Sequence, residues 1–94
     1  MKKTNLENNI FIVARKSQND GKLDYYMLLP NKKEEYMFTR HYSTICYETC
    51  KSGIPVNHML RTRKRNPAVM NLVKYLKFMM PYFIDYFELD VMAG

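Results

Sequence analysis

The segment 52–79 constrains the fold most, because a glycine turn in it separates two stretches of helical spacing. Ser52-Gly53 predicts the end of one helix, since glycine readily takes the left-handed conformation that closes a helix. Pro55 suits the first turn of the next helix, where a missing N–H donor is tolerated. Apolar residues then recur at spacings of three and four and predict one buried stripe: Val56, Met59 and Leu60.

A cluster of positive charge follows this second helix. Four of the five residues 61–65 are basic, and residues 61–80 contain six basic and no acidic side chains. Asn66-Pro67 ends the cluster, because the residue before proline is biased away from helix. Apolar residues at helical spacing then predict a third helix: Val69, Leu72, Val73, Leu76 and Met79.

Over roughly residues 44–79 the chain resembles the Cro/repressor-type (XRE-like) helix-turn-helix domains of phages and low-GC bacteria. The resemblance lies in Thr44 nine residues before Gly53-Ile54-Pro55, in Met59, in the basic loop that ends at Arg65-Asn66-Pro67, and in the apolar pattern from Val69 to Met79. It implies that the helix after the glycine lies in the DNA major groove. Two departures are a loop about two residues shorter than usual and Glu48-Thr49 at positions the family buries. The resemblance implies that base edges are contacted by Val56, Asn57, His58 and Arg61. It implies that phosphates are contacted by the basic loop residues Arg63, Lys64 and Arg65.

The N-terminal half predicts a three-stranded antiparallel β-meander. Strands are expected at 9–17, 23–29 and 35–40, and Asp20-Gly21 between the first two is a hairpin signal because it supplies positive φ angles. With Asp20-Gly21 as the central turn residues, Ala14 would lie opposite Met27. The face toward the helices would then carry Ile10, Ile12, Ala14, Leu23, Tyr25, Met27 and Leu29, and the other face Phe11, Val13, Arg15, Tyr26 and Leu28.

The expected fold class is therefore α+β in a single domain, 1–94. The β-meander (9–40) is followed by a helix-turn-helix-like region (44–65) and a C-terminal helical segment (67–91). The stretch 82–91 reads as helix or as strand. Its large side chains either form a homodimer contact through Phe83, Ile84 and Phe87 or close the monomer's own core.

Two cysteines, four residues apart, and no apolar run near ~20 residues favour a cytoplasmic protein with free thiols and no membrane span. Thr44 is the expected N-cap of a helix that carries both cysteines. His41, Cys46, Cys50 and His58 match no common zinc spacing. A Cys50–His58 pair has no motif behind it, so we expect no enzyme, no metal and no cofactor.

The net charge of +6 favours a polyanionic partner. The sequence therefore predicts a small double-stranded DNA-binding regulator of a phage, plasmid or bacterium that acts as a dimer. One alternative is a phage-type protein that binds and inhibits a host enzyme or defence system. The other is an RNA-binding module that uses the tyrosine-rich strands.

Overall fold

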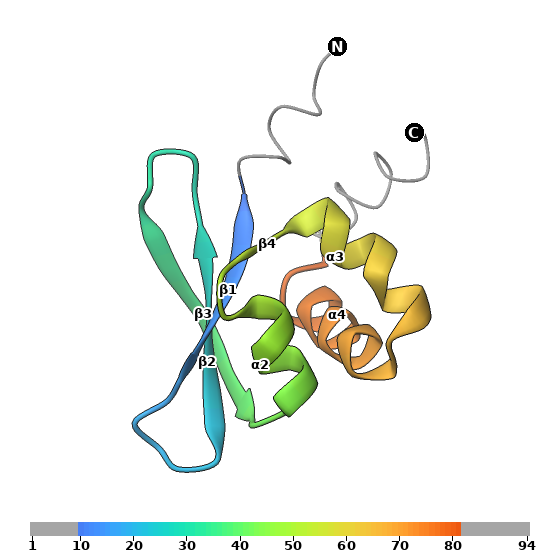
Figure 1. The fold of residues 1–94 in the computed structure, drawn as a ribbon. Coiled ribbons are helices and arrows are strands. Elements are labelled where there is room, and N and C mark those ends of the chain that lie inside the picture. The colour runs from blue at the N-terminus through green and yellow to red at the C-terminus, as the bar shows by residue number, and fades with distance from the viewer. Residues whose placement is uncertain (1–9, 82–94) are drawn as a thin grey trace.

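The computed structural model describes residues 10–81, which form a four-stranded sheet with helices packed on one face (Figure 1). The strands are β1 (Phe11–Lys16), β2 (Lys22–Leu28), β3 (Glu34–His41) and the short β4 (Ile54–Pro55), in the order β3-β2-β1-β4. The helices are α2 (Thr44–Cys50), α3 (Val56–Thr62) and α4 (Pro67–Met79), with a 3₁₀ turn, η1 (Arg63–Arg65), between the last two. The expected α+β class is confirmed.

The β1–β2 hairpin differs from the predicted register by two residues. Ala14 pairs with Tyr25, and Ile12 pairs with Met27. The Ser17 N–H donates to the carbonyl of Lys22 (3.0 Å), so the strands stay paired up to these two residues. The loop between them, residues 18–21, is therefore longer than the two-residue turn we expected. A shift of two keeps every side chain on its predicted face, so the inward-facing strand residues are buried or half-buried as expected.

One apolar core joins the sheet to the three helices. Its fully buried members include Ile12 and Leu23 from the strands, Cys50 from α2, Leu60 from α3 and Leu76 from α4. On the opposite face of the sheet, where we expected it, Val13 is also buried. Gly53 lies against Val13 and Phe11 there, since a Cβ on this glycine would be 3.7 Å from each side chain.

The helix boundaries follow the predicted segments with two local differences. The N-cap of α2 is Ser43 rather than Thr44, because the Ser43 hydroxyl oxygen accepts the N–H of Cys46 (3.2 Å). Pro55 precedes α3 and pairs with Phe11 of β1, so it belongs to β4 and not to the first helical turn. The predicted helix or strand at 82–91, with Phe83, Ile84 and Phe87, lies outside the described residues.

Candidate nucleic-acid interface

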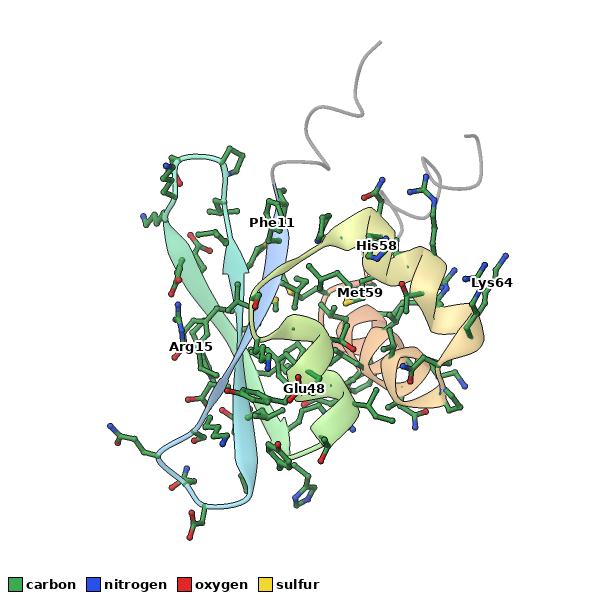
Figure 2. All side chains as sticks on the ribbon, viewed as in Figure 1. Phe11, Arg15, Glu48, His58, Met59 and Lys64 are labelled. Carbon is green, nitrogen blue, oxygen red and sulfur yellow. The ribbon has the colours of Figure 1, made fainter. Side chains whose placement is uncertain are left out.

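Helix α3 has one buried side and one accessible side. Met59 and Leu60 are at most 1% exposed, because they pack into the core between the sheet and α4. His58 and Arg61 are exposed and Asn57 is half-buried. These three lie on the same side of the helix, since residues three and four apart are neighbours on a helical surface. Figure 2 shows His58 on the outer side of α3, away from Met59.

Val56 does not belong to the accessible side, and its prediction as a base-edge contact is wrong. Its side chain is 0% exposed and forms part of the core. The position begins α3, directly after β4, and the Val56 N–H donates to the carbonyl of Ile10 (3.2 Å). The Val56 side chain therefore packs the first turn of α3 against the sheet and stabilises the fold.

The predicted basic loop is a 3₁₀ turn, η1, that continues α3. Lys64 and Arg65 are exposed, whereas Arg63 is half-buried and is held by an interaction of its own. Asn66 ends the turn, and its N–H donates to the carbonyl of Arg63 (3.4 Å). The turn packs on both α3 and α4, which fix the position of its backbone relative to these helices.

Charge is separated along the described chain. All five acidic side chains of residues 10–81 precede residue 49, and residues 49–81 carry seven basic side chains. Arg61, Lys64 and Arg65, here called the basic patch, form no ion pair with any residue between 10 and 81. Figure 2 shows Lys64 at the end of the molecule away from Arg15 on the sheet, with Glu48 between them.

Two cations outside the basic patch, Arg15 and Lys51, are neutralised locally. Arg15 donates two hydrogen bonds to the carboxylate of Glu34, which holds the pKa of Glu34 below its usual range. Lys51 lies 2.8 Å from Glu48, and this hydrogen bond raises the pKa of Lys51. Within residues 10–81, by contrast, no carboxylate pairs with the basic patch.

The helix pair α2–α3 has a distinctive setting. A strand, β3, precedes α2, and the linker between the helices contains β4, which pairs with β1. Gly53 in this linker has a φ of +92°, the left-handed conformation expected for it. Glu48 is exposed on α2, and Cys46 and Cys50 are the residues that this helix buries. Within residues 10–81 the pair is thus fastened to the sheet through β4 and also packs against α4.

The two thiols belong to the core. Cys50 is 0% exposed, and burial raises its pKa to about 12, so the thiol stays protonated at neutral pH. The Cys46 thiol donates to the carbonyl of Ala68 (3.5 Å). Within residues 10–81 no three His, Cys, Asp or Glu side chains gather closely enough to hold a metal ion. In the same part of the chain no helix is long and apolar enough to cross a membrane.

The strand tyrosines are mostly unavailable for stacking. Tyr25 is 1% exposed in the core, and burial raises the pKa of its hydroxyl. Tyr26 is half-buried, with its ring edge-on to Tyr36 and the Arg15 guanidinium 5.0 Å from its centre. Tyr36, 58% exposed, is the strand tyrosine with a largely open ring.

Comparison of the chain with protein-family models, with curated proteins and with solved structures finds no match. The charge, exposure and spacing of residues 57–65 are therefore what supports a function. One positioned cation lay outside the sequence-based prediction, namely Arg40 near the end of β3. Nothing in its sequence surroundings distinguishes it from an ordinary strand residue.

Proposed function

We propose that the protein binds double-stranded DNA through α3 and η1. The observation that carries this proposal is the basic patch, a set of exposed cations that form no ion pair within residues 10–81 and lie next to an accessible helix side. Lysine and arginine gain affinity for duplex DNA by displacing counterions from the phosphates, and an exposed helix fits the major groove. Arg61 and Asn57 are residue types that make paired hydrogen bonds with guanine and adenine edges.

In this arrangement α3 carries the contacts to bases and η1 the contacts to phosphates. Asn57, His58 and Arg61 share the accessible side of α3, and Lys64 and Arg65 follow at its C-terminal end. The buried stripe of α3 fixes the orientation of that side relative to the sheet. Arg63 is half-buried, so we assign it two roles, positioning of the turn and contact with the DNA phosphates.

The test is an electrophoretic mobility shift with random and selected duplexes at low and at physiological salt. The variant Arg61→Gln/Lys64→Gln/Arg65→Gln is compared with Lys16→Gln/Lys22→Gln/Lys33→Gln, which removes the same charge from exposed positions on the sheet side. We expect binding to be lost in the first variant and largely kept in the second. Equal loss in both would mean that net charge alone acts, and the proposal would fail.

A second candidate is a module that docks its basic patch on an acidic protein partner. The setting of α2 favours it, because a strand precedes this helix and Glu48 is exposed at a position that is buried in the helix-turn-helix domains this segment resembles. Such a protein retains no duplex target at physiological salt. The same mobility shift therefore separates the two candidates.

A further inference from the structure

Arg40 is a half-buried cation that is positioned but not neutralised. Its guanidinium carbon lies 4.3 Å from the centre of the Tyr75 ring, and one Nη donates to the carbonyl of Asn71 at 3.5 Å. No carboxylate pairs with it within residues 10–81, in contrast to Arg15. Four of the five guanidinium N–H donors are thus left for another acceptor. Because a charge partly removed from water is costly without a partner, this setting favours an anion.

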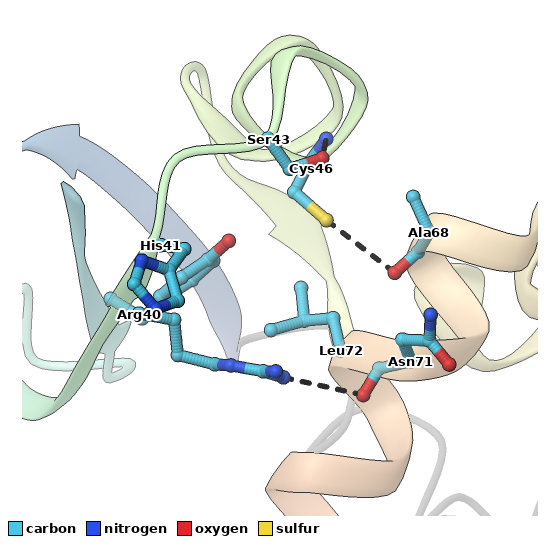
Figure 3. A pocket seen from close by; sticks show the side chains of 8 residues that line it. Arg40, His41, Ser43, Cys46, Ala68, Asn71 and Leu72 are labelled. Carbon is cyan, nitrogen blue, oxygen red and sulfur yellow. Dashed lines mark hydrogen bonds between the residues drawn. The ribbon is translucent and has the colours of Figure 1, made fainter. Parts of the chain in front are cut away.

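The guanidinium lines a small pocket between β3, α2 and α4. The pocket has a volume of about 170 Å³, and none of the eight residues that line it is acidic. Figure 3 shows Arg40 and His41 on one side, Ser43 just before α2 and Cys46 on it, and Asn71 on α4. A space of this size is below that of drug-sized sites and equals the liquid volume of about six waters. It fits one compact oxyanion.

We propose that this pocket binds a phosphate group. The parallel N–H donors of a guanidinium match two phosphate oxygens, and such charge-assisted pairs are among the strongest hydrogen bonds. The Ser43 oxygen already accepts the N–H of Cys46, so its O–H remains a donor, and the Asn71 amide adds two more. Tyr75 and the Asn71 carbonyl hold Arg40 in place beforehand, which lowers the entropy lost on binding.

This inference does not depend on the proposed DNA binding. The phosphate can belong to a free phosphate compound or to a nucleic-acid backbone, since the recognising chemistry is the same. Ala68, which lines the pocket, is three residues after Arg65, so one wall of the pocket is close to the basic patch along the chain. A backbone phosphate at this place would extend the contact surface of η1.

The test is titration of the ¹⁵N-labelled protein with inorganic phosphate at constant ionic strength, with chloride as the matched salt. We expect saturable shifts of the Arg40 Nε–H and of the backbone amides of His41, Cys46 and Asn71. Two variants should weaken this binding at least tenfold. Arg40→Gln removes the guanidinium group and its charge. Asn71→Asp places a carboxylate of nearly equal size, which competes with the phosphate, at an exposed position. Arg61→Gln should leave it unchanged.

Duplex DNA forms the second arm of the experiment. If a backbone phosphate occupies the pocket, duplex shifts the same amides and Arg40→Gln lowers the slope of log affinity against log salt by about one. If a free compound occupies it, inorganic phosphate binds while the duplex affinity of Arg40→Gln equals that of the wild type. Shifts that do not saturate, or that are the same in Arg40→Gln, overturn the proposal. Inorganic phosphate is tested without DNA, so the phosphate titration still tests the pocket if the protein does not bind DNA.

Discussion

The side-chain oxygen of Asn66 accepts the backbone N–H of Ala68 at 3.1 Å and thereby caps helix α4 immediately after the basic turn. The same oxygen accepts the N–H of Val69 at 3.4 Å. Pro67 follows at the first helical position, where it needs no hydrogen-bond acceptor. One residue thus ends η1 with its backbone N–H and begins α4 with its side chain.

Asn66→Ala should destabilise the protein by about 1 kcal/mol, because two N–H groups of α4 lose their acceptor. Asn66→Ser keeps a side-chain oxygen as the cap and should lower the free energy of unfolding by only about a few tenths of a kcal/mol. Urea unfolding followed by circular dichroism measures both. Equal stabilities for Ala and Ser would show that the cap contributes nothing.

Arg61→Ala should cost about 1 to 3 kcal/mol of discrimination at one base pair while non-specific affinity stays nearly the same. Arg61 is exposed on the side of α3 that also carries Asn57 and His58, so its loss affects one contact and not the fold. Fluorescence anisotropy with single-base variants of a selected site measures this. Uniform weakening on every sequence would argue against a base contact.

Lys64→Ala and Arg65→Ala should each flatten the slope of log affinity against log salt by up to about one unit, because fewer counterions are released. Both side chains are exposed and form no ion pair with residues 10–81. Lys33→Ala, exposed on the sheet side, is the control and should leave the slope unchanged. A wild-type slope in the two patch variants would mean that these cations are only solvated.

Gly53→Ala should destabilise the protein by about 1 to 2 kcal/mol through its backbone conformation. The φ of +92° is unfavourable for a residue with a Cβ, whereas the new methyl group would meet Phe11 and Val13 only at ordinary contact distance, 3.7 Å. Gly21→Ala is the control, because Gly21 has a φ of +74° and nothing within 4 Å of a Cβ. Similar losses in thermal unfolding would confirm the conformational cause, and a much larger loss at Gly53 would point to packing.

The stability of the protein should fall with rising pH above about pH 9 partly through Cys50. Burial raises the pKa of this thiol from 9.0 to about 12, so in this window the unfolded chain loses a proton that the folded chain keeps. The contribution is complete below pH 9 and is lost as the pH rises toward 12, at about 1.4 kcal/mol per unit. Cys50→Ala should therefore lose stability with pH less steeply in urea titrations. Parallel pH curves for variant and wild type would contradict this.

Local patterns determined much of the fold in advance. Alternation placed Ile12, Ala14 and Tyr25 on the buried face, and spacings of three and four placed Met59 and Leu60 on the buried side of α3. Asn66-Pro67 marked a helix boundary from the conformational restriction of proline alone. These features depend on a few neighbouring residues, which is why the sequence is enough to predict them.

The tertiary structure decided what depends on packing between distant segments. The hairpin register differs from the expected one by two residues, because the bond between Ser17 and Lys22 leaves a loop of residues 18–21, and a shift of two preserves the faces. Val56 was removed from the candidate interface because β4 brings the start of α3 onto β1, a pairing across more than forty residues. The Arg40 pocket exists because β3, α2 and α4 meet there, and no local pattern encodes that meeting. Charge and periodicity are properties of the chain, whereas exposure and neutralisation of each charge are set by what packs beside it.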